Sequence, residues 1–257
     1  MSAMKRLLSV FGIGAAKIET ILHTQDLVPG ETITGTLTIT GGSVPQDVRD
    51  IYLYTMGRCR FTDDGKTKYR YVTFDEHRIG GSFVIQPSEV VTETFSFALT
   101  YDTPLTVMGN TVYVQTGADI PLAFDPVDED EVVVRPNKMI QAMFDAMTSL
   151  GFRMYKSDCE SGYKYGRRYV QEFEFKPQSG KFRGKLDEVE LICITSPDEL
   201  MVYMQVDRRA RSFKGLIAGA LDLDETRLSF RVTKTDLPMI RTILYEKIAA
   251  HADKDFF

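Results

Sequence analysis

The sequence predicts a mainly β protein: an antiparallel β-sandwich, then a second β-rich domain of sandwich type, with a linking helix and a C-terminal helix. Three observations support this fold class. Many short runs alternate apolar and polar residues, which is the period of a half-buried strand. Gly, Pro and Asp-Gly turn signals separate these runs. Two longer stretches, near residues 138–150 and 237–251, instead repeat apolar residues at helical spacing.

The first well-defined strand lies in residues 27–43, "LVPGETITGTLTITGGS". Its Pro-Gly pair is typical of a tight turn. The residues that alternate with threonines after this turn are Ile33, Leu37 and Ile39. A spacing of two predicts one buried face and one threonine-rich face in water. Gly35 interrupts the apolar face, which indicates either a bulge or a close backbone approach.

Further alternating runs fill the chain up to residue 136. "TDDGK" places an Asp-Gly turn between the runs "IYLYTMGRC" and "YRYVTF", which predicts a hairpin. In "ETFSFALTYDTP", Phe95, Phe97 and Leu99 share one face. "DEVVVRP" closes this half. Many short strands separated by turns predict a β-sandwich over residues 17–136.

The pattern changes after Pro136. The stretch "NKMIQAMFDAMTSLG" predicts a helix with Asn137 as its N-cap and Gly151 as its C-terminal stop. Its methionines recur on one face, and we interpret them as core packing rather than as a cofactor site. A domain boundary therefore falls here, which gives domains at 1–136 and 137–257.

The second half returns to strand patterns. Runs such as "YVQEFEF", "DEVELICITS" and "ELMVYMQVD" predict a mainly β region over residues 152–235. The chain then ends in a helix, for which we expect Asp236 as the cap and Pro238 in the first turn.

Composition narrows the class of protein. The 257 residues carry a net charge of −5 with a pI near 5.4, which argues against broad nucleic-acid binding. The three cysteines, Cys59, Cys159 and Cys193, are far apart and odd in number. We therefore expect neither a disulfide framework nor a metal knuckle, but small buried residues in a reducing cytoplasm.

The N-terminal stretch "MSAMKRLLSVFGIGAAK" has two interpretations. Two basic residues before an apolar run resemble a weak signal peptide. We favour a short amphipathic helix whose apolar face contains Met4, Leu7, Leu8 and Phe11. This helix would either pack on the body of the protein or dock to a partner or a membrane surface. No apolar run approaches the roughly 20 residues of a membrane span, so an integral membrane protein is not expected.

Sequence motifs for catalysis are absent: there is no GxSxG, no P-loop and no HExxH. "GIGAAK" lacks the third glycine of a dinucleotide fingerprint. We therefore predict no catalytic residues, no cofactor and no metal. The acidic residues within 125–131 could bind Ca²⁺, but we favour a solvated acidic loop because the spacing is not that of an EF-hand.

A basic segment stands out in this acidic chain. Its candidate contact residues are Arg208, Arg209, Arg211, Phe213 and Lys214. Such a cluster could grip an acidic protein surface or phosphates, and the alternative is a solvated turn. A homodimer is also possible, through an exposed sheet edge or the N-terminal helix.

The order of several motifs resembles known proteins. "DLVPGETITGTLTITGG" followed by "IYLYTMGR" and "ETFSFALTYDTPLT" resembles the arrestin-type N-terminal domain. "GIGAAKIETIL", "AFDPVDEDEVVVRP" and "LGFRMYKSDCE" are similar to the stage-zero sporulation-control protein M family of bacteria. The resemblance covers nearly the whole chain. It implies an arrestin-like sandwich, a second β-rich domain and a regulatory, non-enzymatic role without catalytic residues.

Two function classes follow. The first is a cytoplasmic regulator or adaptor that binds other proteins through sheet edges and surface patches. The second is a hydrolase or another small-ligand enzyme whose site assembles from remote residues. A deep pocket lined by convergent polar groups would favour the second class.

Overall fold

The computed structural model describes residues 15–24, 26–121, 127–208 and 225–252, and these residues form two compact units. Unit 1 contains the described residues up to Arg58, together with Arg70–Thr106 and Thr111–Arg135. Unit 2 contains the described residues from Pro136 onward, together with Cys59–Tyr69 and Val107–Asn110. The predicted mainly β fold class is confirmed.

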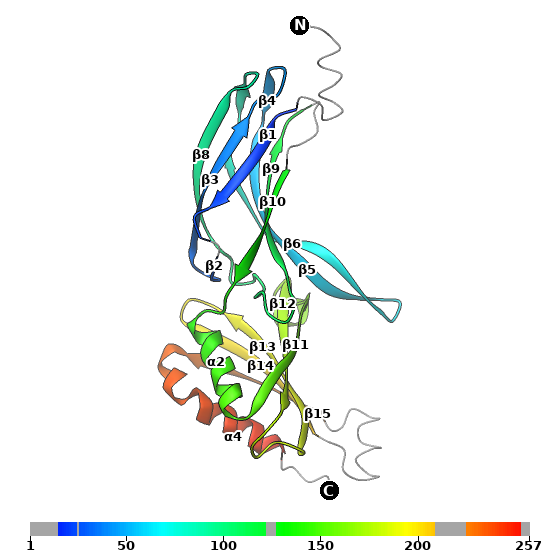
Figure 1. The fold of residues 1–257 in the computed structure, drawn as a ribbon. Coiled ribbons are helices and arrows are strands. Elements are labelled where there is room, and N and C mark those ends of the chain that lie inside the picture. The colour runs from blue at the N-terminus through cyan, green and yellow to red at the C-terminus, as the bar shows by residue number, and fades with distance from the viewer. Residues whose placement is uncertain (1–14, 25, 122–126, 209–224, 253–257) are drawn as a thin grey trace. The chain divides into compact units, whose positions relative to one another are not determined.

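Unit 1 is built from two main layers of strands (Figure 1). One layer is antiparallel and consists of β1 (Lys17–Leu22), β3 (Thr32–Thr40) and β8 (Val90–Ala98). The other layer has β9 (Val112–Asp119) between β5 (Asp50–Asp63) and β10 (Val127–Val134). The remaining strands are β2 (Asp26–Leu27) beside β10, β6 (Lys66–Gly80) beside β5, and the pair β4 (Gln46–Val48) and β7 (Phe83–Ile85).

The threonine-striped strand β3 has the two faces that its alternation predicts. Ile33, Leu37 and Ile39 are buried, whereas Thr32 and Thr34 are exposed. Gly35 lies in the strand because of a close approach: a Cβ there would lie 2.2 Å from Cζ of Phe95 and 2.8 Å from the carbonyl oxygen of Ile21. A side chain at this position would therefore collide with both neighbours.

Two turn regions of unit 1 gave different outcomes. The predicted Asp-Gly turn connects β5 and β6, and Asp64 and Gly65 both have positive φ, at 48° and 72°, as a tight hairpin turn requires. The predicted acidic loop was wrong for residues 127–131, which belong to strand β10. Asp125 lies outside the described residues. Asp128 accepts a hydrogen bond from the backbone N–H of Thr20 at 2.6 Å, so the strand is held by a contact that the spacing of the acidic residues does not reveal.

Unit 2 is an antiparallel sheet with two helices on one of its faces (Figure 1). Its strands run in chain order: β11 (Phe152–Ser161), β12 (Tyr169–Pro177), β13 (Leu186–Thr195), β14 (Glu199–Arg208) and β15 (Glu225–Thr233). The helices are α2 (Lys138–Ser149) and α4 (Ile240–Ala252), and short 3₁₀ turns form η1 (Tyr163–Tyr165) and η2 (Lys234–Met239). The methionine stripe of α2 is core: Met139, Met143 and Met147 are buried.

The predicted N-terminal cap is confirmed for helix α2 and wrong for helix α4. Asn137 caps α2, because its side-chain oxygen accepts from the backbone N–H groups of Met139 and Ile140 at 3.1 and 3.0 Å. Asp236 is not the N-cap of the last helix. It is the third residue of η2 and forms a capping box with Thr233, because the chain makes a 3₁₀ turn before α4 begins.

The prediction that the cysteines form no disulfide was wrong, although Cys59 and Cys159 are buried as predicted. Cys59 and Cys159 form a disulfide within unit 2, with their Cα atoms 4.6 Å apart, and Cys193 is the remaining free thiol. The end of β5 lies beside β11 there, since Arg60 pairs with Glu160. Sequence spacing could not predict a pair separated by 100 residues. The cysteines therefore no longer support the prediction of a reducing compartment.

No helix in the described part of the chain is long and apolar enough to cross a bilayer.

Candidate functional site: two sheet faces

The candidate contact residues from the sequence fall mostly outside the described residues. Arg208 is described, and it lies half-buried at the end of β14. The others lie outside the described residues: Arg209, Arg211, Phe213, Lys214, Leu7, Leu8 and Phe11. Their role as protein contacts stays a prediction.

In unit 1, tyrosines gather on the outer face of the layer that contains β5 and β9. We call Tyr52, Tyr54, Tyr71 and Tyr113 the tyrosine face. The rings of Tyr52 and Tyr54 stack with centroids 6.0 Å apart, and Tyr71 meets Tyr113 edge to face at 5.8 Å. They stand outside because the inward positions of these strands are taken by apolar residues such as Leu53 and Val112.

The tyrosine face is partly exposed and has acidic neighbours. The side chain of Tyr71 is 55% exposed, and the other three tyrosines are half-buried. Glu131 pairs with Tyr113 across β9 and β10, and Glu129 pairs with Gln115 two residues away. Burial and then the negative charge of Glu76 raise the pKa of Tyr54. Aromatic rings with carboxylates beside them form a surface that can pack apolar groups and attract cations.

In unit 2, alternation gives β12 one apolar and one acidic face. Phe173 and Phe175 point toward α2, where both contact the ring of Phe144. Glu172 and Glu174 therefore point to the opposite face, away from the helix. The sequence "EFEF" contains this alternation, but only the packed helix reveals which half is buried.

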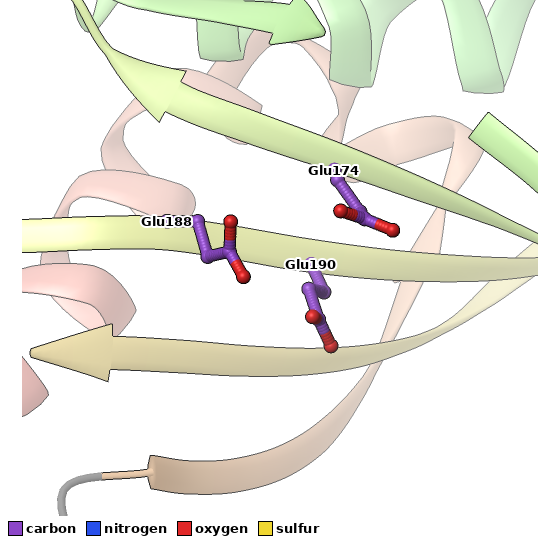
Figure 2. Close-up of side chains that lie close together, drawn as sticks. All are labelled: Glu174, Glu188 and Glu190. Atoms are coloured by element: carbon purple, nitrogen blue, oxygen red, sulfur yellow. The ribbon is translucent and has the colours of Figure 1, made fainter. Parts of the chain in front are cut away.

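Three carboxylates converge on this polar face (Figure 2). Glu188 and Glu190 project from β13 and Glu174 from the neighbouring β12, with one oxygen of each within 4.8 Å of the others. Glu174 is only 6% exposed. Tyr155 donates its hydroxyl to both Glu174 and Glu188, at 2.6 and 2.5 Å, and Lys156 pairs with Glu174.

Carboxylate oxygens at this spacing are ligands that a hard divalent cation such as Ca²⁺ prefers. Two of the three groups, Glu174 and Glu188, already have a tyrosine or lysine partner. The cluster is consequently a candidate for metal binding only if Tyr155 and Lys156 release their carboxylates. The presence of these three glutamates does not test the prediction that the protein binds no metal, which therefore stays a prediction.

A second charge network lies at the neighbouring end of the same face. Arg60 contacts Glu160 at 2.8 Å, Glu172 at 3.2 Å and Asp158 at 3.5 Å. Tyr69 also hydrogen-bonds to Asp158 at 3.2 Å. Burial tends to lower the pKa of Arg60, but its hydrogen bond to Glu160 and the other carboxylates raise that pKa overall. This arginine fixes the hairpin segment Cys59–Tyr69 on β11 and β12.

A pocket of about 510 Å³ opens on the polar face beside these groups. The charged and aromatic residues that line it are Lys164, Tyr165, Glu172, Glu190, Tyr203 and Arg227. Ile192, Gln205 and Ser229 complete much of the floor. Its volume lies within the range of ordinary small-ligand pockets, about 300–1,000 Å³.

Burial and neighbouring acids raise the pKa of both carboxyl groups in the pocket, Glu172 and Glu190. Burial, followed by repulsion from Glu160, raises the pKa of Glu172. Burial, then the charges of Glu172 and three further acidic side chains, raises the pKa of Glu190 to about 8. A cation placed beside either carboxyl group would favour its charged form and lower its pKa.

Sequence analysis missed both faces, although part of the signal was present. "YLY" and "YVQ" placed aromatic residues on the polar side of two strands, and "EFEF" and "DEVEL" did the same for glutamates. The pairing register brings Glu174 opposite Glu190, and no pattern within one strand specifies that register.

Comparison with known proteins agrees with this architecture. The SpoOM protein family matches residues 4–210. The chain is 39% identical over 239 residues to the sporulation-control protein spo0M of Bacillus subtilis (strain 168), covering 92% of this chain and 93% of that protein. It superimposes on the crystal structure of Spo0M, sporulation control protein, from Bacillus subtilis with a TM-score of 0.83 and 36% identity, covering 93% of this chain and all of the other. By fold, by family match and by sequence identity, the chain belongs to the Spo0M family of sporulation-control proteins.

Proposed function

We propose that this protein is a non-enzymatic regulator that binds another protein through the tyrosine face of unit 1. The observation that carries the proposal is the set of four tyrosines on one sheet face, arranged as two ring pairs. Tyrosine is enriched at the energetically important centres of protein interfaces, because its ring buries a large area while its hydroxyl stays hydrated. A regulatory role also agrees with the name of the Bacillus relative.

The charges beside the tyrosines define the kind of partner. The negative charge of Glu76 lies close enough to Tyr54 to raise its pKa, and Glu129 and Glu131 lie on β10, the strand beside β9. A partner surface with lysine or arginine side chains between apolar ones fits this face, because cations interact with both carboxylates and aromatic rings. A second copy of the chain fits poorly here, since it would bring like charges together.

The test compares three forms of the full chain: wild type, Tyr71→Ala with Tyr113→Ala, and a control, Thr38→Ala with Thr92→Ala. The control pair lies directly opposite on β3 and β8, in the other layer of unit 1. We expect wild type and the control to capture the same partner from the native host, with less capture at high salt. The tyrosine variant should lose at least about 90% of it, as expected for two interface tyrosines. Equal capture by all three forms would disprove the proposed face.

Two further predictions accompany this proposal. The first is a cytoplasmic location, which fractionation of native cells would test. The second is a homodimer through a sheet edge or the N-terminal helix. Light scattering that shows a dimer in wild type and also in the tyrosine variant would separate dimer formation from partner binding.

The pocket of unit 2 favours a second candidate function, the binding of a small ligand. A hydrolase would use the same pocket to convert its ligand. Recovery of unchanged ligand after long incubation supports the non-enzymatic proposal, and conversion would contradict it.

A further inference from the structure

We propose that the Cys59–Cys159 disulfide is a redox-controlled clasp for the hairpin arm formed by residues Cys59–Tyr69. The oxidised pair holds this arm against strand β11, and the reduced pair lets it detach while the rest of unit 2 stays folded. The arm consists of the end of β5, the Asp-Gly turn and the start of β6, and all of it belongs to unit 2. This inference goes beyond the protein-binding function proposed above, and it uses no residue of the tyrosine face.

The arm has a buried base and an exposed tip. Cys59 at the base is fully buried, and Cys159 on β11 is only 1% exposed. By contrast, residues 62–69 are all exposed. The ion pair between Lys68 and Asp63 joins the two strands of the arm to each other and not to the sheet. Exposed residues bury little apolar surface, so the tip contributes little to holding the arm in place.

Ion pairs and a hydrogen bond align the base of the arm with β11. Arg60 lies opposite Glu160 where β5 runs parallel to β11. Its guanidinium contacts Glu160 at 2.8 Å and Asp158 at 3.5 Å, and Tyr69 donates a hydrogen bond to Asp158 at 3.2 Å. These contacts keep the two cysteines close together after reduction, which makes the clasp reversible.

The same contacts are too accessible to water to replace the covalent link fully. The side chain of Arg60 is 25% exposed, and that of Glu160 is 20% exposed. Solvent weakens ion pairs of this kind, whereas a disulfide is unaffected by it. Cutting the disulfide should therefore allow the arm to open locally, as a segment of low local stability.

Opening the clasp requires a two-electron reductant, and its chemical class is a dithiol such as a thioredoxin-type protein. One thiolate of the dithiol attacks a sulfur of the Cys59–Cys159 pair, forms a mixed disulfide and releases the other cysteine as a thiolate. The second thiol of the reductant then displaces the remaining cysteine. The dithiol leaves as a disulfide, and the two protons that it loses are balanced by those that the cysteine thiolates take up.

A clasp of this kind suits the predicted cytoplasmic location better than a permanent cross-link does. Thiol pools keep most cytoplasmic cysteines reduced, and the disulfides that do form there are usually transient, catalytic or redox-sensing. The location is a separate prediction, so the test uses purified protein and does not depend on it.

The experiment reduces the full chain with dithiothreitol, removes the reductant and labels the folded protein with N-ethylmaleimide. Peptide mass spectrometry follows each cysteine. Cys193 is the internal reference, because burial raises its pKa to about 12 and keeps it unreactive while unit 2 is folded. We expect Cys59 and Cys159 to react at least about tenfold faster than Cys193, because local opening exposes buried groups without global unfolding. Oxidised glutathione should re-form the link and remove both fast thiols.

Two matched variants each remove one lysine or arginine of the arm. In the reduced chain, Arg60→Met should speed the labelling of Cys59 and Cys159 about fivefold, because it removes the ion pairs to β11. Lys68→Met removes only an ion pair within the arm, and its labelling rates should stay within about twofold of wild type.

Three outcomes would overturn the proposal. If Cys59 and Cys159 react as slowly as Cys193, the arm stays packed without the link. If all three thiols react fast and the circular dichroism of the folded sheet is lost, the link is a structural cross-link and not a clasp. If oxidised glutathione does not re-form the link, the opening is not reversible. The measurement involves no protein partner, so a failure here leaves the tyrosine face untouched.

Discussion

Two sheet faces of this protein show two ways to place polar groups on a β scaffold. The tyrosine face of unit 1 holds four rings that pack in two pairs. The polar face of unit 2 buries carboxylates such as Glu174, which then need Tyr155 and Lys156 as partners. We therefore expect loss of a side chain from the tyrosine face to affect folding little. Loss of a partner from the polar face should destabilise unit 2, because it leaves a buried charge unpaired.

The largest expected effect on stability comes from removing the Cys59–Cys159 disulfide of unit 2. Replacing Cys59 and Cys159 together by Ala removes a cross-link that closes a loop of about 100 residues, so the free energy of unfolding should fall by about 3–5 kcal/mol. Chemical denaturation with and without reductant measures this difference. Cys193→Ala is the control. Equal stability of the double variant and oxidised wild type would show that the pair is not linked in solution.

The thiols can also be counted directly. Burial raises the pKa of Cys193 to about 12, so this thiol should react slowly in the folded protein. After denaturation without reductant, we expect one reactive thiol per chain, and three after reduction. Three thiols before reduction would contradict the cross-link.

The next effect tests whether unit 2 depends on charge partners. Lys156→Met leaves Glu174 buried with one partner fewer and should lower the free energy of unfolding by about 1–3 kcal/mol. Lys68→Met is the matched control, because Lys68 pairs with Asp63 where both side chains are exposed, and it should cost about 0–1 kcal/mol. Equal losses for the two variants would remove the distinction between a buried and an exposed pair.

A pH titration sharpens the comparison further. Burial and repulsion raise the pKa of Glu190 to about 8, whereas an unfolded glutamate titrates near 4.3. Between these values the folded state holds more protons than the unfolded state, so stability falls as pH rises and levels off above about 8. The charged groups that face Glu190 are Glu172, Glu174, Glu188, Asp207 and, across the pocket, Arg227 and Lys164.

Glu190→Gln should flatten this slope and stabilise the protein above pH 8 by on the order of 1–2 kcal/mol, a figure reduced for solvent screening because the side chain is only half-buried. Melting curves from pH 5 to 9 measure the effect. Glu129→Gln on β10 of unit 1 is the control and should leave the slope as it is. Identical slopes for wild type and Glu190→Gln would mean that the carboxyl titrates normally.

The smallest expected effect on folding belongs to the tyrosine face. Tyr71→Ala removes a half-exposed ring and should change the free energy of unfolding by no more than about 1 kcal/mol. Thermal melting measures this change. A loss above about 3 kcal/mol would show that the ring is part of the core and would weaken its assignment as a contact surface.

The sequence was informative where local chemistry decides the structure. Alternation predicted the buried face of β3, the Asp-Gly turn after β5 and the methionine core of α2, because each depends on residues close together in the chain. The helix cap at Asn137 follows for the same reason.

The two sites could not be predicted, because they depend on strand pairing. Glu174 meets Glu190 only when β12 and β13 adopt their register, and Tyr71 meets Tyr113 only when β6 and β9 both lie along β5. The Cys59–Cys159 link has the same origin. The misplaced cap at Asp236 has a local cause instead, since an added 3₁₀ turn shifts the start of the helix. Long-range register is a tertiary property that single-strand patterns do not contain.

The most direct test of the central claim is partner capture by two variants of the full chain. One is Tyr71→Ala with Tyr113→Ala on the tyrosine face, and the other is Glu190→Gln in the pocket of unit 2. The account predicts that the tyrosine variant loses the protein partner, while the pocket variant captures it as well as wild type does. A tyrosine variant that captures the partner as well as wild type does would contradict the claim that this face carries the protein's regulatory contact.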